Sequence, residues 1–595
     1  MEYSKNRLTF AVFLIYSTLL LALPLPEVFA AHNFKAAISP TTGTVDIIST
    51  FMVTISNSSN DNQPNRLGSL KVSIPESFTD LDMLTISLPS RLPRQSWDCN
   101  LSSSTIICHA ATFNDRLMKR ESLSVSISAR PSSAGIFKFS VTAFHAIDFR
   151  NEILITGSQP RVEIYTGNMP SVDAPNIIVI ISDDQRSDIV DFMPTVKNKL
   201  TEHGIKFINS FVTTSLCCPS RASFLTGQYA HNHGVLTNGS PDGGAPKFND
   251  TSTIATWLKQ AGYSTSFVGK YLNGYPALSP YIPLGWDDWH AFRKPGYYSY
   301  TLNENGIHYT FGTGEGDYST DLLLNRALEF IRNSERPFFL VFAPFPPHGD
   351  SESNTVFPIP APRHIATCDN VEPSRPPSFN EVDISDKPSW IKKLPLLKKS
   401  DIAKVDELRK DQICALKAVD EAVNSIINES EIDNTVIIFT SDNGFLLGEH
   451  RIKSGKRCIY EECARVPLII RYPKLISSAI ESDKLVLNID LAPTIAELAG
   501  ATPNIEVDGK SLMPLLSGLD NAWRSDILLE YYFKTGPYTA AVRNMQFKYV
   551  ELGTGERELY DLTNDPYELN NVVKDPAYFT VIEHLEQRLE QLKQE

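Results

Sequence analysis

The sequence predicts an α/β protein in which helices sandwich a large mixed, mostly parallel sheet, with an all-β sandwich before it and a small α+β subdomain after it. Residues 34–165 alternate apolar and polar side chains with period two in short stretches, which is typical of antiparallel sheets. Three later runs, 176–181, 338–342 and 435–440, are continuously apolar and too short for helices, which indicates buried parallel strands. Helical periodicity occurs between these runs, as a parallel sheet requires.

The 595 residues exceed one ordinary domain, and four parts are predicted along them. Residues 1–30 form a secretory signal peptide, because basic residues precede an apolar run and Val28-Phe29-Ala30 provides a small-x-Ala cleavage site. The β sandwich spans residues 31–168, the α/β domain residues 169–516 and the C-terminal subdomain residues 517–595. No later run reaches the roughly 20 apolar residues of a membrane span, so we expect a secreted or extracytoplasmic protein that does not span the membrane after signal cleavage. The alternative is that the N-terminal apolar run stays as an uncleaved anchor.

Each part has its own predicted elements. In the first part, strands are expected at 51–55, 70–74, 123–127 and 137–141, in an immunoglobulin-like size. The α/β domain adds a strand at 264–268 and helices at 193–203, 252–261, 321–333 and 401–427. The last part has strands at 538–543 and 548–551 and a helix at 578–592. The first part is either a glycan-binding or adhesion module or a spacer or lid, and the second is favoured because it holds no cluster of chemically active residues.

Charge and cysteine content limit the partners and the compartment. The formal net charge of −14 argues against nucleic acid as a partner, and a polyanionic substrate would need a local basic patch. Eight cysteines in an exported chain permit disulfides. Cys99–Cys108 is the first pairing expected and Cys458–Cys463 the second.

Polar side chains follow the three apolar runs directly. Asp183 and Asp184 follow the first, His348 comes shortly after the second, and Asp442 and Asn443 follow the third. The carboxyl ends of parallel strands are where open α/β sheets bind ligands. Two adjacent aspartates repel each other unless a cation lies between them, and oxygen ligands favour calcium or magnesium over zinc. The alternative for any one of these aspartates is a turn or a helix cap.

The run Cys217-Cys218-Pro219-Ser220-Arg221 predicts a helix start that carries a nucleophile. Pro219 suits a first helical turn, where its missing N–H and fixed φ are no disadvantage. Free N–H groups at such an end, together with the guanidinium of Arg221, can hold a sulfate or phosphate. The alternative is that Cys217 is a core thiol or half of a disulfide and that Arg221 is a surface charge.

The longer string Cys217-x-Pro219-Ser220-Arg221-x-x-x-Leu225-Thr226-Gly227 resembles the signature of the sulfatase family. The resemblance implies a sulfatase and alkaline-phosphatase-like fold. It also implies that a formylglycine-generating enzyme oxidises Cys217 to formylglycine before folding is complete. At Asp183, Asp184, Asp442 and Asn443 it implies a single Ca²⁺, in preference to Mg²⁺.

The resemblance also implies the roles of the charged residues. Gly269-Lys270-Tyr271 and Lys456, which precedes Tyr460-Glu461-Glu462, occur as in the family. A hydroxyl of the hydrated aldehyde would attack sulfur, with Arg221 stabilising that oxygen. Lys270, Lys456 and His348 would offset the charge on the sulfuryl and leaving-group oxygens, and His348 would be the general acid because its ordinary pKa lies near working pH.

One departure from the general family pattern narrows the resemblance. Many sulfatases have a histidine two or three residues after the first lysine, where this chain has Leu272 and Asn273. The phrase from Gly269 to Asn273, together with His231-Asn232-His233, is similar to the N-acetylglucosamine-6-sulfatase branch. This likeness implies that His233 and Asn273 bind substrate, and that the substrate is a sulfated glycan or small sulfate ester, with the 6-O-sulfate of N-acetylglucosamine favoured.

The family likeness covers Ala174 to about Val572 and leaves the first part uncovered. Two other functions remain open from the sequence. One is a phosphonate or phosphate ester hydrolase of the same superfamily, which can share the fold, the metal site and the cysteine signature. The other is a catalytically silent glycan-binding protein, in which Cys217 stays a thiol.

Overall fold

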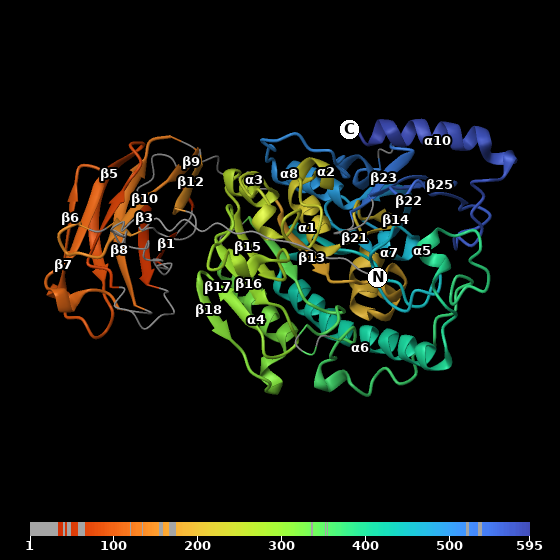
Figure 1. Ribbon diagram of the computed structural model, residues 1–595, viewed down its shortest axis with the longest axis horizontal. Helices are drawn as coiled ribbons and strands as arrows, with labels where there is room; N and C mark the ends of the chain where they lie inside the picture. Colours follow the sequence, from red (N-terminus) through yellow and green to blue (C-terminus); the bar gives the residue numbers. More distant parts are fainter. Residues whose placement is uncertain are drawn as a thin grey trace, which may run out of the picture.

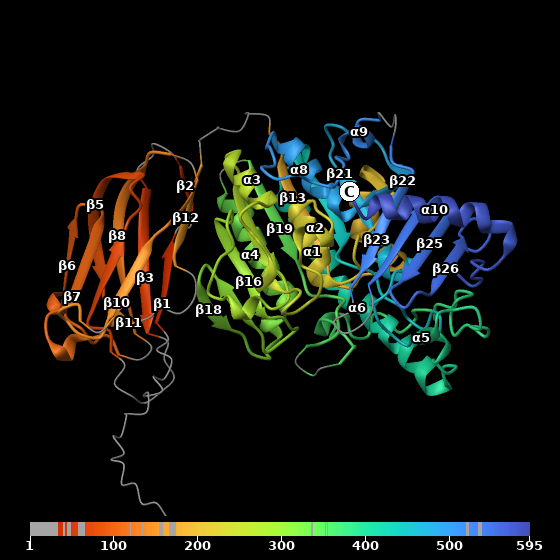
Figure 2. The same cartoon turned by 45° about the horizontal axis from the view of Figure 1, so that its top comes forward.

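The structure, a computed structural model, describes residues 34–595 except 40–41, 45–48, 58–65, 119–120, 134, 151, 154–158, 166–173, 335–336, 352, 354, 519–522 and 533–537. The predicted signal peptide lies outside the described residues, as does most of the segment that joins the first two predicted parts. The N-terminal β-rich region lies beside strand β18 of the large sheet, and the C-terminal sheet lies at the other end of the molecule (Figures 1 and 2).

The N-terminal region is built from two antiparallel sheets and one small sheet. One sheet has the order β1 (Phe34–Ser39), β3 (Ser49–Asn57), β8 (Ser122–Pro131) and β5 (Phe78–Ser87). Another has the order β11 (Glu152–Ile153), β10 (Ser140–Phe144), β4 (Ser69–Ser73), β7 (Thr105–Ala110) and β6 (Trp97–Ser102). The third joins β2 (Thr42–Thr44), β12 (Arg161–Tyr165) and β9 (Gly135–Lys138). Side chains of both larger sheets share one apolar core, so the predicted β-rich region is confirmed.

The strand predicted at 137–141 is in fact two strands. Strand β9 ends at Lys138 and β10 begins at Ser140, and the two belong to different sheets. Between them Phe139 is fully buried in the core, and its N–H bonds to the carbonyl of Pro160. Because Phe139 is buried, the alternation of apolar and polar side chains continues without a break from β9 into β10, and the sequence shows no boundary there.

The large sheet has ten strands in the described residues. Their order is β18 (Ile307–Thr310), β17 (Thr301–Glu304), β16 (Asp288–Lys294), β15 (Ser264–Gly269), β19 (Phe338–Ala343), β13 (Asn176–Ser182), β20 (Thr435–Ser441), β21 (Leu468–Arg471), β14 (Ile205–Phe211) and β22 (Ile480–Leu487). The strands from β16 to β20 run parallel, whereas β17, β18 and β21 pair antiparallel with their neighbours. The sheet is therefore mixed and mostly parallel at its centre, as predicted.

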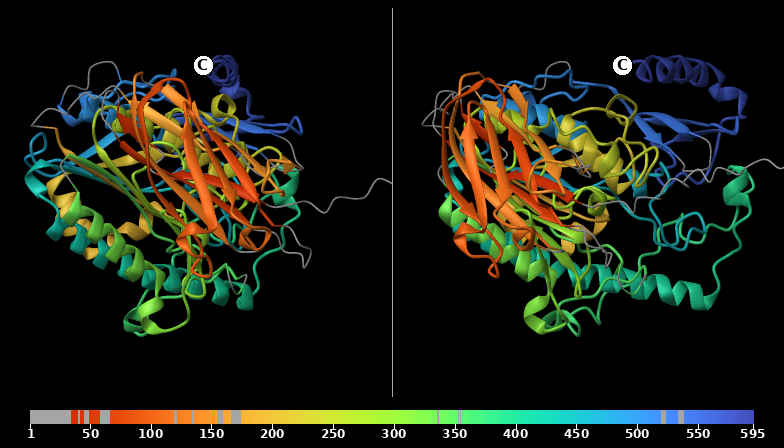
Figure 3. Two further views of the ribbon diagram at one scale, coloured as in Figure 1. Left: turned by 90° about the vertical axis from the view of Figure 1, so that its left-hand side faces the viewer. Right: turned by 60° about the vertical axis from the view of Figure 1, so that its left-hand side comes forward.

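Both faces of the central strands are apolar because helices cover both. Ile177, Val179 and Ile181 face a core that includes α1 (Cys217–Thr226), α3 (Ile254–Gln260) and α8 (Leu491–Ala499). Ile178 and Ile180 face a second core with α4 (Ser319–Asn333) and α6 (Lys399–Glu429). Helix α6 runs along one side of the molecule in both views of Figure 3. A strand that is buried on both faces needs a continuous apolar run, which explains the sequence pattern.

Four of the predicted helices are confirmed, and one is different. Helices α3, α4, α6 and α10 (Phe579–Leu592) match the predicted ranges within a few residues. At 193–203 the structure has a π-helical turn, Val196–Leu200, followed by a 3₁₀ turn, Thr201–His203. The carboxylate of Asp420 on α6 accepts hydrogen bonds from the N–H groups of Thr195 and Val196, at 2.9 and 3.0 Å, and so ties the start of this segment to the neighbouring helix.

The C-terminal sheet joins four antiparallel strands, β23 (Asp526–Tyr531), β24 (Thr539–Asn544), β25 (Phe547–Leu552) and β26 (Arg557–Asp561). Helix α10 packs on it through Ile582, Leu585, Leu589 and Leu592. This spacing places the four side chains on one face of the helix. The sheets and helices agree with the predicted succession of parts, while the predicted boundaries at 30, 168 and 516 stay predictions.

Three disulfides occur in the described residues. Cys99–Cys108 and Cys458–Cys463 were predicted and are confirmed. The third, Cys368–Cys414, links positions 46 residues apart and joins a loop to α6. It was not predicted because the spacing of two cysteines so far apart gives no local signal. None of the described helices is long and apolar enough to cross a bilayer.

Candidate active site

Three adjacent strands of the large sheet end at one place. Strand β13 lies between β19 and β20, and Ser182 at its end is directly opposite Ser441 of β20. The residues that follow these strand ends therefore meet: the N–H of Asp184 donates to a carboxylate oxygen of Asp442 at 3.1 Å, and the Nδ2 of Asn443 donates to Asp184 at 2.8 Å. All four of the predicted metal ligands are at most 3% exposed.

Helix α1 brings Cys217 to this place. The helix begins at Cys217, with Leu216 at its N-cap, and ends at Thr226. Gly227 caps it with a φ of 72°, the left-handed conformation that glycine adopts most easily. The Sγ of Cys217 lies 3.6 Å from a carboxylate oxygen of Asp183 and 4.0 Å from one of Asp184. The side chain of Asn238 accepts a hydrogen bond from the N–H of Cys218 at 2.9 Å, so one of the donors at this helix end is already in use.

The thiol of Cys217 is a poor nucleophile as it stands. It is 1% exposed, and burial raises its pKa to about 12 although Lys270 and Lys456 act against this rise. At neutral pH the group is therefore a neutral thiol, whereas cysteine nucleophiles react as thiolates. Burial therefore opposes formation of the Cys217 thiolate.

Two lysines and an arginine neutralise the carboxylates. Lys270 forms an ion pair with Asp183, and Lys456 forms one with Asp184 while its Nζ lies 2.7 Å from the Sγ of Cys217. Burial would lower the pKa of both lysines, but the surrounding anions outweigh it and raise the pKa of each, so both are ammonium ions. Arg221 donates from Nε to Asp442 at 2.8 Å and from a second nitrogen to the carbonyl of Lys270.

The four oxygen ligands fit a hard divalent cation. Burial opposes charge on Asp183, yet Lys270 and His348 hold its pKa below the ordinary value, so it is a carboxylate. The Oδ1 of Asn443 is buried and has no hydrogen-bond partner in the described residues, whereas its Nδ2 is used. Asp184 has a φ of 69°, a left-handed backbone conformation that is uncommon outside glycine and often marks a functional position. An orphaned amide oxygen beside three carboxylates is the donor set that Ca²⁺ or Mg²⁺ takes.

His348 completes the cluster from the loop after β19. Its Nε2 lies 3.8 Å from a carboxylate oxygen of Asp184, and its Nδ1 donates to the carbonyl of Gly349 at 2.7 Å. The hydroxyl of Tyr297 donates to the backbone carbonyl of His348 at 2.7 Å and so fixes the loop. Burial lowers the pKa of His348, although Asp183 and Asp184 act in the opposite direction. Since Nδ1 carries the proton of the neutral ring, Nε2 is protonated only in the imidazolium form.

The two residues predicted to bind substrate have different environments. His233 lies behind α1, where its ring nitrogens bond to the hydroxyl of Ser223 at 3.0 Å and the N–H of Val235 at 3.1 Å. Both nitrogens therefore form hydrogen bonds within the protein, and the substrate contact of His233 stays a prediction. Asn273 lies on the loop after β15, and its Oδ1 is buried without a partner in the described residues, so its substrate contact stays a prediction.

A pocket of about 430 Å³ opens onto this cluster. Asp184, His348 and Lys456 of the cluster line it. Most of the other lining residues were not predicted as site residues from the sequence, among them Val356, Trp390 and Arg457. Arg457 had one usable signal, its position directly after Lys456, whereas Val356 and Trp390 had none.

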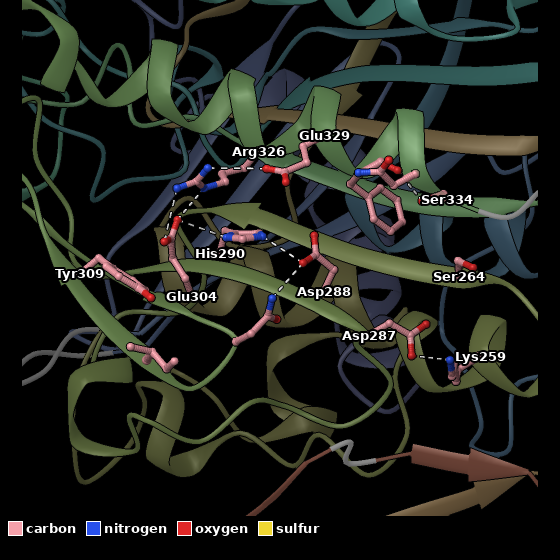
Figure 4. A pocket seen from close by; sticks show the side chains of 14 residues that line it. Lys259, Ser264, Asp287, Asp288, His290, Glu304, Tyr309, Arg326, Glu329 and Ser334 are labelled. Atoms are coloured by element: carbon pink, nitrogen blue, oxygen red, sulfur yellow. Dashed lines mark hydrogen bonds and ion pairs between the residues drawn. The ribbon is translucent and has the colours of Figure 1, made fainter. Parts of the chain in front are cut away.

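A larger cavity, of about 780 Å³, lies elsewhere between α4 and the strands β16 to β18 (Figure 4). It includes Ser264 and Asp288, which begin β15 and β16, and so it is at the end of the sheet away from Cys217. Its charged side chains pair with one another: His290 lies between Asp288, at 2.9 Å, and Glu304, at 3.3 Å, and Glu304 also accepts from Arg326 at 2.7 Å. The smaller pocket at Cys217 is therefore the candidate active site.

The His290 cluster gives a testable pH dependence. Burial would lower the pKa of His290, but hydrogen bonds to Asp288 and Glu304 raise it to about 9. The resulting stabilisation is complete below the ordinary histidine pKa and is lost as the pH rises through 9, so the free energy of unfolding should fall by up to about 3 kcal/mol between pH 6 and 10. Denaturant unfolding of the wild type and of His290→Gln would measure this.

The variant should lose that part of the pH dependence. His584→Gln changes an exposed histidine of α10 and serves as the control. Equal pH dependence in the wild type and in His290→Gln would contradict the expectation.

The fold and the candidate site together define an α/β enzyme of the alkaline-phosphatase-like class, with a cysteine at the start of helix α1 beside a candidate cation site. A sequence model of the sulfatase family matches residues 175–501, and a model of the C-terminal region of N-sulphoglucosamine sulphohydrolase matches residues 448–595. The chain belongs to the sulfatase family, as the signature at Cys217 predicted.

Similar proteins that are named as sulfatases agree with this assignment. The chain is 34% identical over 458 residues to the N-acetylglucosamine-6-sulfatase of Capra hircus, which covers 67% of this chain and 80% of that protein. It is 36% identical over 382 residues to the extracellular sulfatase SULF-1 homolog of Drosophila melanogaster, covering 60% of this chain and 33% of that protein. The chain thus spans about half or less of the length of the SULF-1 homologs that it matches.

Solved structures share the fold. BT4656, solved in complex with its substrate D-glucosamine-2-N,6-O-disulfate, has a TM-score of 0.58 and 28% identity, and the match covers 71% of this chain and 98% of that one. The phosphonate monoester hydrolase of Agrobacterium radiobacter has a TM-score of 0.56 at 22% identity, covering 70% of this chain and 95% of that one, which shows a common fold only.

Proposed function

We propose that this protein hydrolyses sulfate esters, with the 6-O-sulfate of N-acetylglucosamine units in sulfated glycans as its substrate. Formylglycine at position 217 and one Ca²⁺ would serve the reaction. The observation that carries the proposal is the position of the Cys217 Sγ, 2.7 Å from the Nζ of Lys456 and within 4.0 Å of Asp183 and Asp184. A nucleophile, a cation site and two ammonium groups thus meet in one buried place.

The side chains of this chain have separate tasks in the proposed reaction. The bound cation would supply charge stabilisation to the sulfate oxygens, and the hydrated aldehyde would supply one hydroxyl for attack on sulfur and a second whose collapse to the aldehyde releases sulfate. Lys270 and Lys456 offset the negative charge of the sulfuryl group. Arg221, held by Asp442, keeps one buried guanidinium nitrogen without a hydrogen-bond partner in the described residues, and that nitrogen can donate to the ligand.

His348 is the proposed general acid. Because its Nδ1 proton is committed to Gly349, the acid role requires a second proton on Nε2. An anionic ester beside the ring favours that protonated form and opposes the effect of burial. Tyr297 and Gly349 hold the ring so that Nε2 faces the Asp184 side of the pocket.

The substrate assignment rests on two supports. Relatives named N-acetylglucosamine-6-sulfatase align over 67% of this chain, and the related BT4656 was solved with a 6-O-sulfated glucosamine. The local motif from Gly269 to Asn273 is the second support. Maturation would need a formylglycine-generating enzyme, and a location outside the cytoplasm is supported by the N-terminal sequence and by relatives named extracellular sulfatases.

Turnover of matched esters tests the proposal. Protein produced together with a formylglycine-generating enzyme should hydrolyse 4-nitrophenyl sulfate and N-acetylglucosamine 6-sulfate. The ratio of kcat/KM for 4-nitrophenyl sulfate to that for 4-nitrophenyl phosphate or a phenylphosphonate ester should be roughly 100 or more. A preference for the phosphorus esters would assign the protein to the phosphonate or phosphate hydrolases, and no turnover at all would leave a glycan-binding role.

A further inference from the structure

We propose that Arg457 and Trp390 form a subsite for a second anionic group on the substrate, so that the preferred substrate is a 6-sulfated sugar that carries, or is joined to, another negative charge. This inference rests on the proposed function and specifies its substrate. The second anion is either a further sulfate on the same sugar or the carboxylate of a neighbouring uronic acid.

The pocket beside Cys217 has several apolar lining residues, which a sulfate group alone would not contact favourably. Besides the charged residues, five apolar side chains line it: Val356, Trp390, Phe445, Leu446 and Ile452. Trp390, on the short helix α5 (Ser389–Lys392), is 37% exposed although it is a large aromatic residue. Sugar rings present apolar C–H faces, and an exposed indole in a pocket wall is suited to contact such a face.

Arg457 differs from the other cations around the site. Arg221, Lys270 and Lys456 are each paired with a carboxylate of the cluster. Arg457 lines the pocket and is exposed, and within the described residues it forms no ion pair with an acidic side chain. Because no acidic side chain of the described residues pairs with this positive charge, an anionic ligand can serve as its counterion.

The backbone that carries Arg457 is fixed. The next residue, Cys458, is held by its disulfide with Cys463, and its carbonyl accepts a hydrogen bond from the hydroxyl of Ser215. Burial raises the pKa of Tyr531 to about 12, and the charges of Arg457 and Lys456 both act against this rise. Both cations also line the same pocket.

These positions define what the second group must be. The cluster cations serve the carboxylates and the sulfate that reacts, which leaves Arg457 for an anion elsewhere on the substrate. A guanidinium presents paired N–H donors that match two oxygens of a carboxylate or a sulfate. The ring between the two anions would lie against Trp390.

Steady-state kinetics with three substrates test the subsite. N-acetylglucosamine 6-sulfate carries one anion, glucosamine 2-N,6-O-disulfate carries two on one sugar, and a disaccharide of a uronic acid and 6-sulfated N-acetylglucosamine carries the second on a neighbour. Arg457→Gln should lower kcat/KM roughly 10-fold or more for at least one doubly charged substrate, through KM, and about 2-fold or less for the singly charged one. Arg457→Lys should restore part of the loss. The substrate that loses most identifies whether the second anion is a sulfate or a carboxylate.

Trp390 and a matched control complete the design. Trp390→Ala should raise KM for all three sugars by roughly 5- to 20-fold, and Trp390→Phe should recover most of it. Lys453→Gln removes a charge from the same loop at a residue that pairs with Asp401 at 2.7 Å and does not line the pocket, so it should leave all three values unchanged.

Two different failures can be separated. If the wild type hydrolyses the sulfated sugars but Arg457→Gln changes kcat/KM equally for singly and doubly charged substrates, or not at all, the subsite is wrong and the proposed function stands. If the wild type turns over none of these sulfates, the proposed function itself fails.

Discussion

Replacing Cys217 by alanine should reduce sulfate ester turnover by roughly four orders of magnitude or more, because it removes the reacting atom while the binding groups remain. The residue is 1% exposed and alanine is smaller, so the fold should persist. Cys217→Ser is more informative. A serine hydroxyl can accept the sulfuryl group but has no second hydroxyl on the same carbon to expel it, so the variant should retain one sulfate per chain after a single turnover.

Cys218→Ala is the matched control for this prediction. Cys218 is equally buried, in the same helical turn, and has no proposed role, so its variant should keep most of the activity. The measurements are kcat with 4-nitrophenyl sulfate and the mass of the peptide that contains position 217, which is lower for the aldehyde than for the thiol. An unmodified thiol in fully active protein would contradict the formylglycine proposal.

Removal of the divalent cation should lower activity by roughly a thousand-fold, and Ca²⁺ should restore it better than Mg²⁺. Without the cation, the buried carboxylates of Asp183, Asp184 and Asp442 are balanced only by Lys270, Lys456 and Arg221, the groups that the reaction needs for sulfate. Added Ca²⁺ should also raise the melting temperature, because a ligand that binds only the folded state stabilises it.

Metal content gives a readout that does not depend on activity. Wild-type protein after dialysis should contain about one Ca²⁺ per chain, and Asp183→Asn should contain far less. Asp287→Asn, which changes an aspartate of the larger cavity, should keep the metal. Full calcium content in Asp183→Asn, or activity that resists exhaustive chelation, would show that these oxygens do not hold the cation.

The central strands of the large sheet could be predicted because short stretches of the sequence carry their pattern. The runs at 176–181, 338–342 and 435–440 are apolar at every position since β13, β19 and β20 are covered on both faces, and few other structures require that pattern. The positions of Asp183, His348 and Asp442 followed from the rule that parallel strands end together. Strands such as β14 and β21 were not predicted, because their apolar runs are shorter or interrupted and do not differ from those of buried loops.

The rest of the site depends on contacts between distant segments. Trp390 reaches the pocket from α5, and Tyr297 fixes His348 from a loop before β17; neither position shows a periodic or spacing signal. The motif of His233 resembles that of a substrate-binding residue, while its two ring nitrogens bond within the protein, to Ser223 and Val235. Sequence patterns identify which side chains can do chemistry, whereas their direction depends on packing.

The burial of Cys217 has a consequence for how the active protein is made. The Cys217 side chain is 1% exposed and begins a helix that is buried throughout. A modifying enzyme therefore cannot reach it once the domain has folded. If Cys217 is oxidised as proposed, the oxidation must precede folding, and chains that fold first stay unmodified and inactive until they are unfolded again. The specific activity of a preparation would then depend on the amount of oxidising enzyme present during synthesis. Refolding unmodified chains together with that enzyme should restore activity.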